Sequence, residues 1–298
     1  MLSQDYVARF QRDGFLNAGR VADDRTLAEL TAELDRIIAI GPGGFLEGQP
    51  KPVLFRDLLS KGYDNTGGEG KPAVSATPVW QIVNIWEASE AFRRLLHHPV
   101  IVDAIHQLTG FADLQVWHDQ VQYKPANNGG STTWHQDAPL WPSIEPMTPV
   151  SAWLPMDDAD EANGCMWMVP GSHMWGNQMP YIGTLNGIKT LPAFKEIGGD
   201  FQVPAESAIR EVRAVACPVR RGEVHFHHSL TWHGSPENHS SRPRRAIAIH
   251  YMTSEARYTG RQHPMQPFIQ VGIGEAMLGA GPHFPVVCRH GKVLPAPV

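Results

Sequence analysis

Residues 134–141 read Trp-His-Gln-Asp-Ala-Pro-Leu-Trp, and the interpretation of the whole chain depends on this stretch. On a β-strand, side chains two residues apart project from the same face, so His135 and Asp137 can reach one metal ion while Gln136 points away. An imidazole nitrogen and a carboxylate oxygen are two of the three protein ligands in non-haem Fe(II) oxygenases. The stretch therefore predicts a portion of an iron site, with the third ligand on a distant strand.

The third ligand is expected in the histidine-rich stretch 225–239. We favour His233, which lies in Thr-Trp-His-Gly-Ser-Pro (231–236). Three ligands on one face of an octahedral ion would leave three positions open, two for a 2-oxo acid and one for dioxygen. The alternative ligands in this stretch are His225, His227 and His228.

An arginine at a suitable distance from His233 supports this choice. Arg244 follows His233 by eleven residues and begins Arg-Arg-Ala-Ile-Ala-Ile-His-Tyr, a predicted strand. Arg244, Ala246 and Ala248 share one face of that strand, so the guanidinium has open space in front of it. Because arginine binds carboxylates through two parallel hydrogen bonds, Arg244 suits the distal carboxylate of 2-oxoglutarate.

Further motifs occur in a recognisable order along nearly the whole chain. They are Phe-Gln-Arg-Asp-Gly-Phe-Leu (10–16), the segment 83–110, Asn-Gly followed by Pro-Gly-Ser-His within 163–173, and Gly-Glu-Val-His-Phe (222–226) before His233-Gly-Ser, Asn238 and Arg244. With the His-x-Asp pair, this order resembles the phytanoyl-CoA dioxygenase family of Fe(II)- and 2-oxoglutarate-dependent oxygenases. The resemblance implies that His135, Asp137 and His233 bind iron, and that Arg244 binds the far carboxylate of the cosubstrate.

The resemblance also places two more residues beside 2-oxoglutarate. Trp153 matches a position where the family often has an aromatic side chain, although a core role within Val-Ser-Ala-Trp-Leu-Pro (150–155) is equally expected. Gln122 lies on a predicted strand at 114–124, on a polar face that it shares with His118, Gln120 and Lys124. That face points either into the barrel or to solvent.

The activity that the resemblance implies is that of a 2-oxoglutarate-dependent non-haem iron dioxygenase. With Fe(II), 2-oxoglutarate and dioxygen, it would hydroxylate an unactivated C–H bond of a small molecule and release succinate and CO2. Asp137 favours hydroxylation, because halogenating relatives have a small residue in its place. One alternative is oxidative desaturation or cyclisation of a secondary metabolite by the same site. Another is a cupin-like metal-binding protein without 2-oxoglutarate chemistry, which would leave the spacing of Arg244 unexplained.

The expected fold is mainly β with flanking α, a double-stranded β-helix (jelly-roll, cupin-like) barrel with N-terminal helices packed outside, in a single domain over residues 1–298. Hydrophobic spacing and breakers predict helices at 4–12, 24–40, 90–97 and 100–108, within a mostly helical N-terminal region that spans residues 1–112. Short alternating strands separated by Gly, Pro and Asn follow over 113–298. Irregular stretches at 42–78 and 176–210 are expected to cover the iron, the second as a lid-like insertion.

Composition is consistent with an enzyme that acts on a small molecule. The net charge of −5 comes from interspersed charges, so we expect neither a nucleic-acid partner nor a membrane partner. Three widely spaced cysteines argue against a disulfide framework and favour a cytoplasmic location. No pattern specifies an oligomeric state or the prime substrate.

Overall fold

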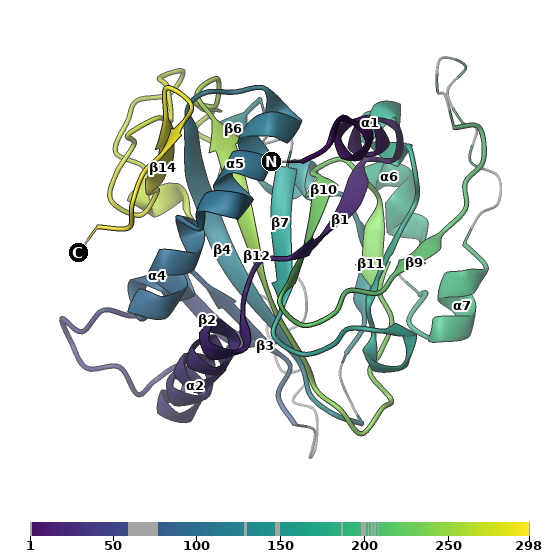
Figure 1. The fold of residues 1–298 in the computed structure, drawn as a ribbon, viewed down its shortest axis with the longest axis horizontal. Helices are drawn as coiled ribbons and strands as arrows, with labels where there is room; N and C mark the ends of the chain where they lie inside the picture. Colours follow the sequence, from purple (N-terminus) through teal and green to yellow (C-terminus); the bar gives the residue numbers. More distant parts are fainter. Residues whose placement is uncertain are drawn as a thin grey trace.

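Two antiparallel β-sheets face each other across a cavity, with helices on the outside of the larger sheet (Figure 1). The computed structural model describes residues 2–58, 77–127, 130–146, 150–185, 187–197, 201, 203, 205, 207 and 209–297. The predicted mainly β fold, a double-stranded β-helix with helices packed outside, is confirmed.

Within the described residues, the larger sheet has nine strands in the order β1-β10-β7-β12-β4-β14-β15, with β3 beside β4 and β2 beside β3. The strands are β1 Phe15–Arg20, β2 Leu54–Asp57, β3 Trp80–Val83, β4 Leu114–Lys124, β7 Val150–Pro155, β10 Glu223–His228, β12 Arg244–Thr253, β14 Val286–Arg289 and β15 Lys292–Val293.

The smaller sheet has four strands in the order β5-β11-β8-β9. They are β5 Thr132–His135, β11 His233–Ser235, β8 Met166–Met168 and β9 Val215–Cys217. A separate two-stranded sheet pairs β6 Ile144–Glu145 with β13 Arg257–Tyr258.

The four predicted helices are confirmed, within one or two residues at each end. The helices are α1 Gln4–Asp13, α2 Asp24–Ile40, α4 Glu90–Leu96, α5 Pro99–Thr109, α6 Met179–Ile182 and α7 Leu191–Lys195. Short 3-10 helices span Ile85–Glu87, Ala138–Leu140, Glu161–Asn163, Ser172–Trp175, Gly183–Leu185 and Gln266–Phe268. None of the described helices is long and apolar enough to cross a bilayer.

Alternation along β12 separates the helix-covered core from the cavity. Ile247 and Ile249 pack in a core with apolar residues of α2 and α5. Ala246 and Ala248 belong to a second core between the sheets, and Ala248 lines the cavity. Small side chains on the inner face therefore leave room in front of Arg244, as the sequence pattern predicted.

The N-terminal region contains strands as well as helices. β1 adds to the edge of the larger sheet beside β10, and β3 pairs with β4. The sequence analysis did not predict these strands, because they are short and are formed by pairing with residues far along the chain.

The two stretches predicted to be irregular contain regular structure. Strand β2 lies in the first stretch, although residues 59–76 fall outside the described portion of the chain. Helices α6 and α7 lie in the second, where residues 186, 198–200, 202, 204, 206 and 208 are likewise outside it. Met179 and Lys189 of this second stretch line the cavity.

A glycine joins α1 to the barrel at a point of close contact. Gly14 ends the helix with φ +82° and donates its backbone N–H to Phe10 O at 2.7 Å. A Cβ atom on Gly14 would lie 2.4 Å from His173 Nδ1 and 2.5 Å from Thr231 Oγ1. Both the dihedral angle and the packing therefore require glycine.

We expect Gly14→Ala to lower the free energy of unfolding by about 2–4 kcal/mol, because it adds left-handed backbone strain and an overpacked contact. Gly19→Ala is the matched control, since Gly19 has φ +85° but a Cβ atom on it would meet no other atom within 4 Å. Gly19→Ala should lower the free energy of unfolding by only about 1 kcal/mol, the cost of the left-handed backbone conformation. Urea denaturation measures the free energy of unfolding of both variants. Equal decreases would show that the close contacts of Gly14 add nothing to the cost of the substitution.

Candidate metal centre

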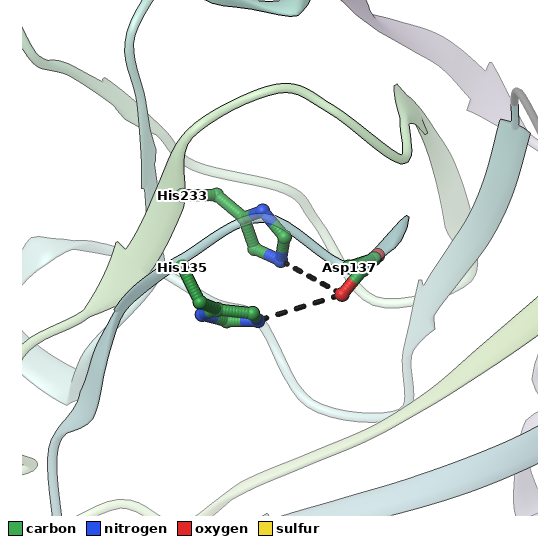
Figure 2. A group of neighbouring side chains, drawn as sticks. All are labelled: His135, Asp137 and His233. Atoms are coloured by element: carbon green, nitrogen blue, oxygen red, sulfur yellow. Dashed lines mark ion pairs between the residues drawn. The ribbon is translucent and has the colours of Figure 1, made fainter. Parts of the chain in front are cut away.

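Three side chains of the smaller sheet and the turn after it converge on one point (Figure 2). His135 ends β5, His233 begins the neighbouring β11, and the two residues are paired in register. Their Nε2 atoms lie 3.5 Å and 3.6 Å from Asp137 Oδ1. The three candidate ligand atoms all lie within 4.8 Å of one another, a separation that one metal ion can bridge.

The local structure around Asp137 differs from the prediction. The prediction placed His135 and Asp137 on one strand, but β5 ends at His135 and Asp137 has helical dihedral angles, φ −70° and ψ −49°. It precedes a 3-10 turn that contains Pro139, and proline cannot continue a strand ladder. Gln136 points away from the cluster as predicted, and its Nε2 donates to Gly176 O and Leu230 O at 2.8 Å and 2.7 Å.

Backbone carbonyls fix the orientation of both imidazoles. His135 Nδ1 donates to Thr133 O at 2.8 Å, and His233 Nδ1 donates to Thr231 O at 2.9 Å. Because a carbonyl only accepts, the proton of each neutral ring lies on Nδ1 and the Nε2 lone pair faces Asp137. Metal-binding histidines usually donate their second nitrogen in this way, so the donor set fits a divalent metal ion.

A third imidazole contacts the other oxygen of Asp137. His227 Nε2 lies 3.1 Å from Oδ2, and both side chains are almost fully buried. Burial alone would raise the pKa of Asp137, but the surrounding imidazoles, His233 first among them, hold it well below its usual range. The carboxylate is therefore anionic, with Oδ1 directed toward the two Nε2 atoms.

Of the alternative ligands in 225–239, only His227 contacts this cluster among the described residues. His225 Nδ1 pairs with Asn17 Oδ1 at 2.6 Å. His228 Nδ1 accepts from Leu230 N at 3.0 Å. Neither of these two histidines belongs to the group of candidate ligands.

A cavity of about 740 Å³ contains the cluster and extends between the two sheets. Arg244, Trp153 and Gln122, the three residues predicted to border the cosubstrate, all line it. Trp153 is buried, and the Arg244 Cζ atom lies 5.7 Å from the centre of its ring system. The polar face of β4 that includes Gln122 therefore points into the barrel and not to solvent.

A buried lysine lies beside Arg244 and was not singled out from the sequence. Lys124 and Arg244 are paired across β4 and β12, and both side chains are buried. Lys124 Nζ donates to Ser235 Oγ and Pro236 O, each at 2.6 Å. Burial, reinforced by the charge of Arg244, lowers the pKa of Lys124 well below its usual value. The signal in the sequence was its position on the polar face of the predicted strand at 114–124.

Comparisons with known proteins agree with this arrangement. The family model "Phytanoyl-CoA dioxygenase (PhyH)" matches residues 10–246. Phytanoyl-CoA dioxygenase domain-containing protein 1 of Mus musculus is 28% identical over 292 residues, covering 89% of this chain and 95% of the relative. Ectoine dioxygenase of Bordetella parapertussis is 24% identical over 269 residues, covering 89% of this chain and 80% of the relative.

Solved structures with low sequence identity share the fold. The α-ketoglutarate-dependent carbocyclase SnoK from nogalamycin biosynthesis superposes with a TM-score of 0.68 at 21% identity, covering 96% of each chain. EctD from S. alaskensis, solved with 2-oxoglutarate and 5-hydroxyectoine, gives a TM-score of 0.60 at 18% identity, covering 86% of this chain and 78% of that chain. The likeness extends over most of each chain.

The geometry predicts one tight divalent-metal site per chain. We expect Co(II), titrated by calorimetry, to bind the wild type with one-to-one stoichiometry and His233→Ala at least a hundredfold more weakly, because one of three ligands is lost. His239→Ala is the control, since the His239 side chain is 68% exposed and outside the cluster. Equal binding by the wild type and His233→Ala would contradict this site.

His227 is predicted to support the metal through Asp137. His227→Phe removes the partner of Oδ2 and should weaken Co(II) binding by about 10–100-fold, as losses of such supporting groups do. His227→Gln, whose amide can still donate to Oδ2, should recover most of the affinity. Equal weakening in the two variants would indicate that the ring contributes by packing alone.

Proposed function

Because the chain belongs to the phytanoyl-CoA dioxygenase family, we propose that it is an Fe(II)- and 2-oxoglutarate-dependent oxygenase that hydroxylates an unactivated C–H bond of a small molecule. The observation that carries this proposal is the presence, in one cavity, of the His135–Asp137–His233 cluster and the buried Arg244. The cluster suits iron, and the arginine suits a dicarboxylate that reaches the iron at its other end.

Each residue has a distinct role in this proposal. His135 and His233 would hold Fe(II) through Nε2, and Asp137 through Oδ1. With 2-oxoglutarate and dioxygen, the bound iron supplies the oxidation, in which the cosubstrate is decarboxylated to succinate and CO2. Arg244 would bind the far carboxylate, beside the ring of Trp153, while Gln122 offers an amide from the next strand. The protein thus contributes mainly by positioning.

Burial strengthens the proposed interaction of the cosubstrate with Arg244. The side chain has no exposed surface, and Lys124 adds a second basic group beside it. Charge interactions are stronger in such a site than in water, because less solvent screens them. A dianionic cosubstrate would thus be held at the Arg244 end and directed along the cavity toward the iron ligands.

Oxidative cyclisation or desaturation by the same site is a second candidate. It is favoured by the similarity of the fold to that of a carbocyclase, SnoK, and an epimerase, SnoN, both described as α-ketoglutarate-dependent. Asp137 suits these reactions as well as hydroxylation, because all of them use the same three ligands. The cupin-like alternative without 2-oxoglutarate is disfavoured by the family match and by Arg244.

A cytoplasmic location and a small-molecule substrate complete the proposal. Cys165, Cys217 and Cys288 are free and buried, as is usual in a reducing compartment. The cavity lies between the two sheets and is of a size that holds small molecules.

The wild type is expected to form succinate from 2-oxoglutarate under air only when Fe(II) is present. The anaerobic Fe(II) protein should also develop a visible charge-transfer band on titration with 2-oxoglutarate. Absence of both signals from folded, iron-loaded protein would overturn the proposal.

Arg244→Lys keeps a positive charge but loses the planar guanidinium that forms two parallel hydrogen bonds with a carboxylate. The concentration of 2-oxoglutarate at half-maximal band intensity should therefore rise at least tenfold, which corresponds to about 1.4 kcal/mol of binding free energy. Arg245→Lys is the matched control, because Arg245 points to the other side of the strand and binds Asp157 at 2.8 Å. A similar shift in both variants would argue against a specific role for Arg244.

A further inference from the structure

A pair of histidines lies in the cavity wall apart from the metal ligands. His118 on β4 and His250 on β12 are directly opposite each other, with ring centroids 4.7 Å apart. Both line the cavity, and both are buried, with exposures of 3% and 4%. Neither belongs to the metal-ligand cluster, and the proposed roles of the iron ligands and Arg244 do not involve them.

The histidine pair lies on the same two strands as Arg244 and Lys124, but far along them from the end of the cavity where the cosubstrate is proposed to bind. Arg244 pairs with Lys124, and His250 pairs with His118 six residues further along. Six residues of β-strand span about 20 Å. The candidate metal centre borders both ends. Ser235, two residues after His233, accepts from Lys124. His227, which contacts Asp137, is paired with Ser151 of β7, and Ser151 is paired with His250.

Each ring has one nitrogen in a hydrogen bond with the protein, and both side chains line the cavity. His118 Nδ1 donates to Asp119 O at 3.3 Å, so the Nε2 of the neutral ring is an acceptor. His250 Nδ1 shares a hydrogen bond of 2.7 Å with Ser151 Oγ. Among the residues that the structure describes, no group hydrogen-bonds to Nε2 of either ring.

Both rings are held neutral and in place. Burial lowers the pKa of His118 to about 3 and that of His250 well below its usual value. Trp141 packs against both rings, with centroids 5.5 Å and 4.5 Å away. The pair therefore offers a fixed, uncharged hydrogen-bonding site, and a buried polar group of this kind requires a partner.

The wall near the pair contains apolar side chains and a third histidine, His263, whose ring centroid lies 6.0 Å from that of His118, while amide groups and Arg56 lie on the adjoining strands. Leu140, Trp141 and Pro264 line the cavity with the histidines. On the adjoining strands, Gln81 Nε2 donates to Gln120 Oε1 at 2.7 Å, and Arg56 Nε donates to Gln81 Oε1 at 2.7 Å. The full cavity of about 740 Å³ lies within the range of roughly 300–1,000 Å³ that holds drug-sized ligands.

We propose that the His118–His250 pair binds a hydroxyl group of the prime substrate, an uncharged and largely apolar molecule, and positions it beside the metal centre. This inference rests on the proposed function, since it assigns the remaining space of the same cavity. The hydroxyl donates a hydrogen bond to the acceptor nitrogen, Nε2, of His118. A carboxylate or phosphate in this place would face two neutral rings without a partner of opposite charge at the pair itself, because Arg244 and Lys124 lie at the other end of the two strands.

The test uses 2-naphthol and 2-naphthoate as matched probes, which differ in carrying a hydroxyl or a carboxylate on the same ring system. Calorimetry of each probe with the anaerobic Fe(II) and 2-oxoglutarate-loaded protein should show at least tenfold tighter binding of 2-naphthol.

His118→Phe and His250→Phe should each weaken 2-naphthol binding at least tenfold. His118→Gln and His250→Gln, whose amide reaches the position of Nε2, should recover some of it. His239→Gln, at an exposed position, should bind like the wild type.

The 2-oxoglutarate charge-transfer band, recorded for every variant, separates this inference from the proposed function and verifies that each variant is folded. A wild type that forms the band but does not bind 2-naphthol, or that prefers 2-naphthoate, would overturn the inference alone. Phe variants that form the band and bind 2-naphthol like the wild type would do the same. Loss of the band in the wild type would instead overturn the proposed function, and the comparison of the two probes with iron-free protein would still decide the role of the pair.

Discussion

The antiparallel pairing of β4 with β12 is the constraint on which the cavity depends. This register places Lys124 opposite Arg244 and His118 opposite His250. Because side chains alternate across a strand, a shift of β12 by one residue would move Arg244 out of the cavity and bring Arg245 into it. The isoleucines that now pack under the helices would then face the cavity, so the hydrophobic core and the polar site specify the same register.

Strand pairing in the smaller sheet likewise assembles the candidate metal centre. The pairing of β5 with β11 sets His135 beside His233, and backbone carbonyls two residues earlier in the chain orient both rings. Asp137 reaches the same point because the chain leaves the sheet immediately after His135. The site therefore uses the end of one strand, the start of another and a turn, and neither sheet contains it alone.

Sequence patterns predicted the features that depend on local interactions or on residue type. Helix α2 begins after Asp23, whose side chain accepts from Thr26 N at 2.8 Å. An aspartate before an apolar periodic stretch marks a helix start and can be read from the sequence. The candidate metal cluster was predicted because histidine and aspartate are characteristic ligands, and the structure brings the three side chains together. Strand β1 and the roles of Lys124 and His118 were missed, since each depends on a partner more than 100 residues away, on β10, β11 or β12. The turn at Asp137 was missed because the alternation argument gave too little weight to Pro139.

Gln136, the residue between two candidate ligands, has a consequence for how this protein can diversify. Its side chain binds Gly176 O, Leu230 O and the backbone N–H of Gln178, at 2.8, 2.7 and 2.7 Å. Residues 176–178 are thereby anchored to the loop that carries Asp137, while later residues such as Lys189 also line the cavity. Changes at residues 176–179 would be transmitted to the candidate ligands, because Met179 Sδ also accepts from the backbone N–H of Gln136 at 3.4 Å. Directed evolution toward new substrates should therefore leave this anchor intact and vary the sequence after it.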